Sequence, residues 1–322
     1  MDVFLAKLSL ILGHIATAML PQIMNNLPQK YIHSGLTFVI KRPLRYLLPL
    51  SVIAAMASCS GSGDKEKAED LLAQAETAVK EADYQRAILL TDSIKRAYPK
   101  EIDTRRRALH VASTATEGLT LRQLETADSI LAVTGVRGDS LSRLVKFVSN
   151  PIEGYYTGAS VNPSAFHGTT GIQARVSPGG DFYIISSIPV AKGVKSTSVA
   201  VSCDGESIAT STVPHDGERN DRSLGAEIIT FMGVECEDLG RFIADNRDRQ
   251  LTLTFNGAKS VSVPLPKDQA EEVATLYDYA STLREAKLAA IEKERLTRAL
   301  DLARSQSART YIEKDSLVNE NR

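Results

Sequence analysis

The sequence predicts an α+β protein, and three changes in hydrophobic period along the chain support this. Residues 68–149 repeat their apolar side chains at the helical spacing i, i+3, i+4, i+7. Residues 150–266 alternate apolar and polar side chains, with turn residues between the alternating runs. From residue 267 to residue 311 the helical period returns. We therefore expect N-terminal helical hairpins, a central antiparallel β-sandwich and one long C-terminal helix.

The composition is that of a folded protein. Of its 322 residues, 43% are hydrophobic and 24% are charged, and this length allows two ordinary domains. The formal net charge of −1 argues against a nucleic-acid partner, which needs a basic surface. The three cysteines lack metal-ligand spacing, and the sequence has no phosphate-binding or dinucleotide motif. We expect no metal, no cofactor and no catalytic activity.

An export signal lies well inside the chain. A basic stretch, 41–45, precedes the mostly apolar run 46–57, which is too short to span a bilayer. Such a basic-then-apolar order is typical of a secretory signal. We expect residues 1–58 to form a signal region, with 39–58 as the signal peptide and translation starting near its first residue.

The run Met56-Ala57-Ser58-Cys59 resembles a bacterial lipobox, with Met where that family prefers Leu. The resemblance implies that Cys59 is diacylated and that the chain before it is removed. Residues 59–67 would then tether a lipid-anchored protein of the cell envelope, on the periplasmic or the surface face of the outer membrane. The alternatives are an uncleaved anchor or a buried helix with a chance cysteine, and a second signal or transmembrane helix over 3–20.

Two amphipathic helices open the domain 68–149. The first carries Ala68, Leu71, Leu72, Ala75, Ala78, Val79 and Ala82 on one face, and the second carries Tyr84, Ala87, Ile88, Thr91, Ile94 and Tyr98. This pair resembles a tetratricopeptide repeat, with Ala87 at the small crossing position and Pro99 as the terminal proline. Leu71 and Ala75 replace the usual Trp and Gly. The resemblance implies a surface that docks protein partners.

A second helix pair is expected over 102–116 and 119–133, because Asp-Ser-Ile recurs close to the repeat period. A fifth helix, capped by Asp139 and carrying Leu144 and Val148, would close the domain. The change of period at Asn150-Pro151 places the domain boundary there.

Two hairpins of the strand domain allow their registers to be predicted. A two-residue turn at Asp204-Gly205 pairs Val201 with Ile208. A three-residue connection with a glycine bulge after Asn256 brings Leu253 onto the face of Val263, whereas a two-residue turn would set it against Ser260. Six to eight strands and a short helix over 237–246 are expected between 150 and 266.

The C-terminal helix is expected over 267–311, followed by a tail, 312–322. Its apolar stripe contains Val273, Leu276, Tyr277, Ala280, Leu283, Leu288 and Ile291. Beyond this stripe charged residues dominate, so the second half is expected to project into solvent or to meet a partner helix. A seam over Leu296, Ala299, Leu300 and Ala303 could form a weak dimer.

Four hypotheses concern individual sites. Cys203 and Cys236 either form a disulfide outside the reducing cytosol or are separate buried thiols. Tyr155 and Tyr156 either stack on a glycan or divide between core and surface. His215, beside Asp216, and His167 are interpreted as loop histidines rather than catalytic ones.

The fourth hypothesis is O-glycosylation. The triplet Asp-Ser-Ile or Asp-Ser-Leu occurs four times and resembles the acceptor used on exported proteins of Bacteroidota. The acceptors would be Ser93, Ser129, Ser140 and Ser316. The alternative is that Asp-Ser merely favours helix starts and turns.

Together these features predict a non-enzymatic, lipid-anchored interaction or scaffold protein of the cell envelope. It would contact the membrane through Cys59 and a protein partner through its helical repeats or its C-terminal helix. The alternative is an accessory lipoprotein for glycan binding or outer-membrane assembly. A hydrolase is the third hypothesis, and the sequence contains no hydrolase motif to support it.

Overall fold

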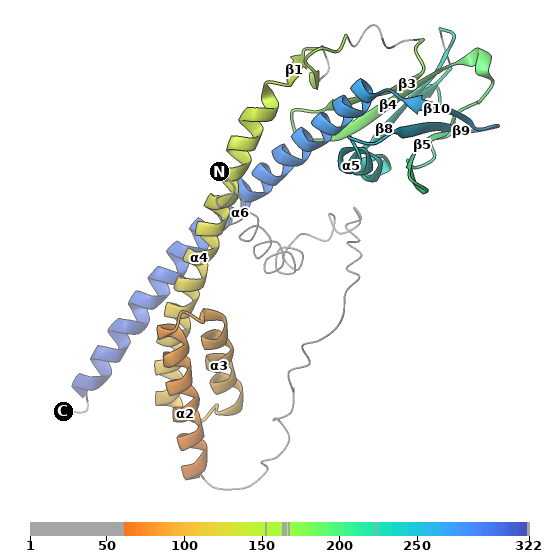
Figure 1. Ribbon diagram of the computed structural model, residues 1–322. Helices are drawn as coiled ribbons and strands as arrows, with labels where there is room; N and C mark the ends of the chain where they lie inside the picture. Colours follow the sequence, from red (N-terminus) through yellow and green to blue (C-terminus); the bar gives the residue numbers. More distant parts are fainter. Residues whose placement is uncertain (1–60, 152, 163–165, 167, 223, 321–322) are drawn as a thin grey trace. The chain divides into compact units, whose positions relative to one another are not determined.

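The computed structural model describes residues 61–151, 153–162, 166, 168–222 and 224–320, and these form an α+β protein, as expected (Figure 1). Helices α2, α3 and α4 come first, two antiparallel sheets follow, and the long helix α6 ends the described chain. Among the described residues, no helix is long and apolar enough to cross a membrane.

Helices α2 (Gly61–Lys80) and α3 (Tyr84–Ala97) form the predicted hairpin. The predicted tether over 59–67 is wrong from Gly61 onward, because these residues form the first turns of α2. The carboxylate of Asp83 accepts the backbone N–H of Arg86 at 3.2 Å and caps α3. Ala87 is fully buried, and Leu72 and Ile94 fill the space between the helices. Small residues at the crossing therefore allow a close approach, as the tetratricopeptide resemblance implied.

The predicted second helix pair is wrong. Helix α4 (Ile102–Ser142) is one uninterrupted helix of 41 residues. Gly118 lies within this helix, and a Cβ added there would lie 2.4 Å from the ring of Tyr84. Glycine at this position therefore allows α3 and α4 to approach closely.

The predicted fifth helix is also wrong. Its residues divide between the end of α4 and strand β1 (Val145–Val148), which pairs with β2 (Tyr155–Gly158). Asp139 lies inside α4 and caps nothing. The strand region thus begins before the predicted boundary at Asn150-Pro151.

The strands form two antiparallel sheets. The first has the order β1-β2-β3-β4-β8-β7 and the second β10-β9-β5-β6. Nine of these strands lie among the described residues between 150 and 266, where six to eight were expected. The remaining strands are β3 (Gly171–Val176), β4 (Phe182–Pro189), β5 (Ser198–Cys203), β6 (Glu206–Ala209), β7 (Asn220–Asp221), β8 (Ala226–Met232), β9 (Leu251–Asn256) and β10 (Val261–Leu265). One apolar core joins both sheets, which is the predicted sandwich.

Both predicted hairpin registers are confirmed. Val201 pairs with Ile208 across the turn Asp204-Gly205, and Leu253 pairs with Val263. The glycine after Asn256 has a different role from the one expected, since Gly257 is not among the residues with positive φ. A Cβ at Gly257 would lie 2.3 Å from the carbonyl oxygen of Lys195, so close backbone approach requires glycine here.

Helix α5 (Glu237–Asp245) lies where the short helix was predicted. Helix α6 (Lys267–Glu320) is longer than predicted and continues through most of the expected tail. Val273, Leu276 and Ala280 of α6 are fully buried in the sandwich core, but Leu288 and Ile291 are exposed. The predicted docking stripe therefore ends near Leu283.

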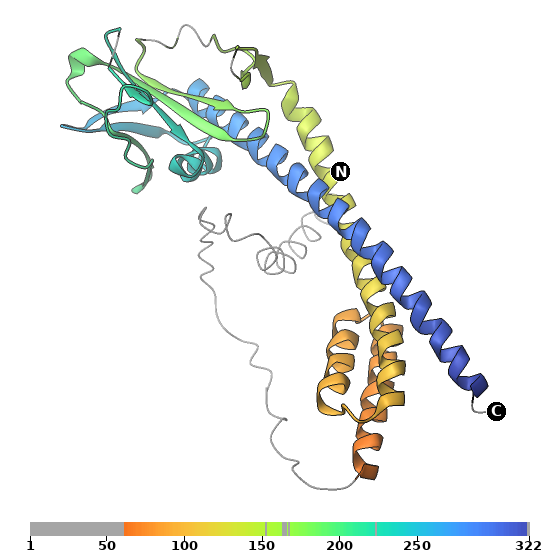
Figure 2. The same ribbon diagram turned by 180° about the vertical axis from the view of Figure 1, so that it is seen from behind.

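The second half of α6 packs against α4 of the same chain (Figures 1 and 2). The two helices are antiparallel, because Arg137 donates to Thr282 at 2.8 Å, Lys293 pairs with Asp128 at 2.6 Å and Arg304 pairs with Glu117 at 3.1 Å. Leu296, Leu300 and Ala303 are buried along this contact, so the residues proposed as a dimer seam are occupied within the chain.

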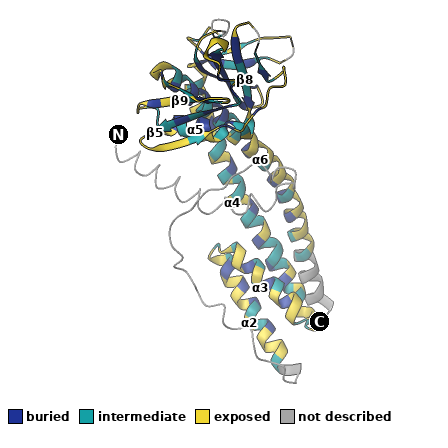
Figure 3. Ribbon diagram, turned by 90° about the vertical axis from the view of Figure 1, so that its right-hand side faces the viewer, coloured by how far each residue is buried: buried dark blue, intermediate teal, exposed yellow. Residues whose placement is uncertain are grey.

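Small residues recur every seven positions on both helices of this pair. On α4 they are Thr120, Ala127 and Thr134, and on α6 they are Thr282, Ala289 and Ala303, with Leu296 at the remaining position. A seven-residue repeat of buried positions is typical of a coiled coil. Figure 3 shows the resulting succession of buried and exposed residues along α4 and α6.

Candidate functional site

Several predicted sites lie outside the described residues. These are the signal region, Cys59 with the start of its tether, and His167. Ser316 falls within α6, but its side chain is not described. Lipidation of Cys59 stays a prediction.

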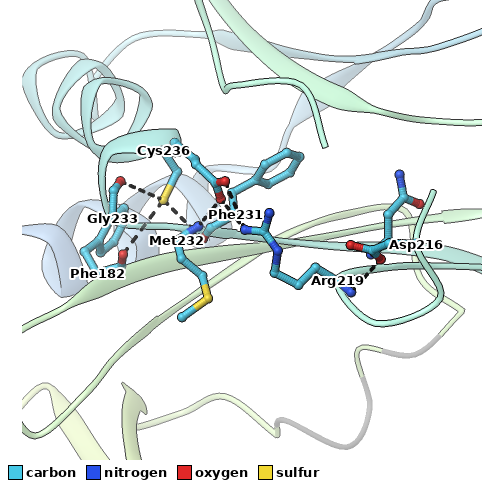
Figure 4. A network of polar contacts seen from close by, with 9 residues as sticks. Phe182, Asp216, Arg219, Phe231, Met232, Gly233 and Cys236 are labelled. Atoms are coloured by element: carbon cyan, nitrogen blue, oxygen red, sulfur yellow. Dashed lines mark hydrogen bonds and ion pairs between the residues drawn. The ribbon is translucent and has the colours of Figure 1, made fainter. Parts of the chain in front are cut away.

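Cys203 and Cys236 are both free and buried, so the disulfide hypothesis is wrong for this structure. Cys203 ends β5 in the four-stranded sheet, whereas Cys236 precedes α5. The thiol of Cys236 donates to the carbonyl oxygen of Phe231, with sulfur and oxygen 3.3 Å apart, as Figure 4 shows. Burial raises the pKa of Cys236 to about 12, which keeps it protonated and unreactive at neutral pH.

The loop containing His215 and Asp216 is a structural turn. The carboxylate of Asp216 accepts the backbone N–H groups of Glu218, Arg219 and Asn220, each at 2.9 Å, and these bonds hold its pKa below the usual range. Arg219 then reaches Glu235, whose two carboxylate oxygens lie 2.8 and 2.9 Å from one guanidinium nitrogen (Figure 4). This network joins the loop to the end of β8 and gives one carboxylate oxygen of Asp216 a structural role. The interpretation of His215 as a loop histidine stays a prediction.

A second polar network holds the neighbouring loop. The buried carboxylate of Glu227 accepts the backbone N–H of Lys195 at 3.0 Å and that of Ser196. Asn220 donates to the carbonyl oxygens of Ser196 at 3.0 Å and Val213 at 2.7 Å. These buried groups satisfy loop backbone that the sheets leave unpaired, which is a stabilising role.

The two tyrosines proposed as a glycan platform are packed against protein. Tyr155 is buried beneath the guanidinium of Arg175, which lies 4.2 Å from the ring centre. Tyr156 packs between Phe147 and Tyr279, with ring centres 5.2 Å apart in both pairs. Both rings contribute to packing, and glycan binding stays untested.

Ser93, Ser129 and Ser140 are exposed but lie within helices. Each hydroxyl donates to the carbonyl oxygen four residues earlier, at 2.9 to 3.0 Å. The alternative explanation, that Asp-Ser favours helix starts and turns, therefore does not account for these three sites. Glycosylation of them stays a prediction.

One buried carboxyl has a strongly shifted pKa. Glu272 of α6 lies against the end of β2, where a Cβ on Gly158 would be 3.1 Å from its side chain. Burial raises the pKa of Glu272 to about 7. Within the described part of the chain, no group of three or more His, Cys, Asp or Glu side chains could hold a metal ion.

A hollow of about 300 Å³ lies between α3 and α4, and sequence reasoning missed it. Lys95 of α3 and Arg105 and Arg106 of α4 line it together with Ile102 and Leu109. The two apolar side chains are 58% and 51% exposed. Ala108 is buried at its floor, so the hollow combines an apolar base with basic walls. We call this surface the α3–α4 groove.

The charges of the α3–α4 groove are unbalanced. Against three cations its lining has one acid, Asp92, which lies 3.8 Å from Arg96 outside the lining. Arg105 is anchored, because its Nη1 donates to the carbonyl oxygen of Pro99 at 2.8 Å. Its Nε is buried and has no hydrogen-bond partner among the described residues.

A sequence signal for this groove did exist. Ile102 and Leu109 lie seven positions apart with Arg105 and Arg106 between them, so an apolar and basic face could be recognised on one helix. Set against known proteins, the chain matches no protein-family model, no curated protein and no solved structure.

Proposed function

We propose that this chain is a lipid-anchored scaffold of the cell envelope that holds protein partners without catalysis. The observation that carries the proposal is the continuity of α6. Its first part contributes Val273 and Leu276 to the sandwich core, and its second part packs along α4 as far as Thr310, whose hydroxyl lies 3.2 Å from His110. A single helix thus fixes the strand domain to α4, on which the helical hairpin packs, as a rigid scaffold requires.

The lipobox-like run that ends at Cys59 supports the anchor, and only Ser60 separates Cys59 from the first residue of α2. A diacylated Cys59 would fix the helical hairpin close to the membrane surface. The chain beyond it would extend from the lipid and present its surfaces to other envelope proteins.

The test has two parts, beginning with the anchor. We expect wild-type protein in its native cell to incorporate labelled fatty acid and Cys59→Ala to lose the label. Cys203→Ala is the matched control and should keep the label, since Cys203 is buried in the strand domain. Labelled Cys59→Ala protein would contradict the anchor.

The second part concerns the partners. Chemical cross-linking in intact native cells should join the wild-type chain to the same envelope protein in repeated experiments, and Cys59→Ala should lose this product. A chain that cross-links to nothing, while its fatty-acid label is intact, would contradict the scaffold function.

A further inference from the structure

We propose that the α3–α4 groove binds an amphipathic, acidic α-helix of a partner protein. The proposal rests on the scaffold function and names the chemistry of the partner. Three independent features of the groove support it: its place in the helix stack, its exposed apolar side chains and its excess of positive charge.

The first feature is the place of the groove in a stack of helices. In stacked helical hairpins, each helix buries its apolar face against the hairpins before and after it. After α2 and α3, helix α4 begins like the first helix of another hairpin, with Thr104 and Arg107 both bonded to Glu69 of α2. A returning helix would lie against α3 and α4, but α4 continues straight for 41 residues. Helix α6 returns along α4 through His110, which does not line the groove. The groove therefore lies at the place beside α3 and α4 that the returning helix of a hairpin would occupy.

The second feature is the apolar side chains of the groove. Ile102 and Leu109 are seven residues apart on α4 and point outward above the buried Ala108. Two apolar positions separated by two helical turns match the i, i+3, i+4, i+7 side chains of a docked amphipathic helix. The hollow of about 300 Å³ has room for side chains to enter it, which a flat bilayer surface would not fill.

The third feature is charge. Lys95, Arg105 and Arg106 flank the apolar positions, and the groove's one acid lies beside Arg96. Charge complementarity therefore selects a helix with Glu or Asp beside its apolar stripe and disfavours a basic one.

The experiment uses the full chain, purified in detergent, and a stapled 15-residue peptide. The peptide carries Leu at i, i+4, i+7 and i+11, with Glu at the positions beside them, and its binding is measured by fluorescence anisotropy. A second peptide has Lys in place of every Glu. We expect the Glu peptide to bind at least tenfold more tightly than the Lys peptide.

Variants locate the binding surface. Ile102→Asp and Arg106→Glu should each weaken binding of the Glu peptide at least tenfold. Leu288→Asp and Lys287→Glu are the matched controls on α6 and should change the affinity for the Glu peptide less than twofold. Leu288 matches Ile102 because the exposed fractions of the two residues are similar, 55% and 58%. Because all four positions are exposed, each variant should keep the helix content of the wild type, as measured by circular dichroism.

Four results of the peptide experiment would overturn the proposal. They are no binding of the Glu peptide, equal binding of the Lys peptide, equal effects of groove and control variants, and binding that occurs only after residues 311–322 are removed, which would make the chain's own end the occupant. Vesicles containing phosphatidylglycerol that bind through Ile102 and Arg106, without peptide binding, would identify a lipid surface instead. A native cross-linked partner that Arg106→Glu retains would refute the groove and leave the scaffold function intact.

Discussion

The core of the strand domain and the core of the helical hairpin are built from side chains of different sizes. The largest fully buried side chains of the sandwich include Phe182, Phe231 and Phe255, whereas the hairpin with α4 is centred on alanines. Those alanines are Ala75, Ala78, Ala87, Ala108 and Ala115. The strand domain gains stability from apolar area per residue, and the helices gain it from close approach of their backbones. Truncating a large side chain should therefore destabilise the strand domain, and enlarging a small side chain should destabilise the helices.

The largest effect is expected from a truncation in the sandwich. Phe231 is fully buried in the core between the sheets, so Phe231→Ala should lower the free energy of unfolding by about 3–5 kcal/mol. Denaturant unfolding followed by circular dichroism measures the loss. A loss below about 1 kcal/mol would mean that the core collapses around the cavity and is not well packed.

The next effect is a difference between the two regions in how their stability depends on pH. Glu272 is buried beside β2, and its raised pKa means that its contribution is complete below its ordinary pKa of 4.5 and is lost as pH rises through about 7. The change is at most about 3 kcal/mol. Glu272→Gln should flatten the stability profile of the strand domain between pH 5 and pH 8, and an unchanged profile would contradict the assignment.

Glu69, at the helical end, should show the opposite dependence. Its hydrogen bond from Thr104 and the guanidinium of Arg107 lower its pKa. Its contribution is therefore present above 4.5 and is lost as pH falls through the lowered pKa. Acid should weaken the α2–α4 contact, whereas a rise from acidic to neutral pH should weaken the strand domain, and chemical-shift changes in each region would distinguish them.

Overpacking should harm the helices. Ala127 is buried in the seven-residue repeat of α4, so Ala127→Leu should force α4 and α6 apart and cost about 1–3 kcal/mol. The exposed Ala132 lies on the same helix, and Ala132→Leu is the matched control with no expected loss. Equal stability of the two variants in thermal unfolding would show that the helix pair is loosely packed.

The smallest effects come from two glycines of α4 and have opposite signs. Gly135 has open space around it, so Gly135→Ala should stabilise the helix by up to about 1 kcal/mol. Gly118 lies under the ring of Tyr84, so Gly118→Ala must displace that ring and should destabilise the protein. If both variants were stabilised alike, the ring would be free to move and the α3–α4 contact would be weaker than described.

Local patterns of the sequence predicted much of the strand domain. Turn residues and the period of two fixed the register of Val201 with Ile208 and of Leu253 with Val263, because both partners lie within a few residues of the turn. The hairpin of α2 and α3 was predictable for the same reason. The pattern could not predict the length of α4. Gly118 lies inside this helix and contacts Tyr84, 34 positions earlier, and a local sequence pattern does not show a contact at that separation.

The site was harder to predict than the fold. The α3–α4 groove exists because α4 does not turn back, which is itself a consequence of distant contacts. Cys203 and Cys236 could be weighed as a pair from sequence, but only the assembled core shows that both are buried in it as free thiols. Residues such as Lys95 and Arg106 read as ordinary surface charges until the helices are assembled.

The antiparallel pairing of α4 with α6 has a consequence for how the chain folds. Its contacts join residues far apart in sequence, such as Glu117 with Arg304 and His110 with Thr310, and such contacts form slowly because a long loop must close first. During synthesis, α4 is complete long before α6 exists. Its small-residue face must stay unpaired, and exposed to aggregation, until the last residues arrive. The antiparallel contact between α4 and α6 is thus expected to form last.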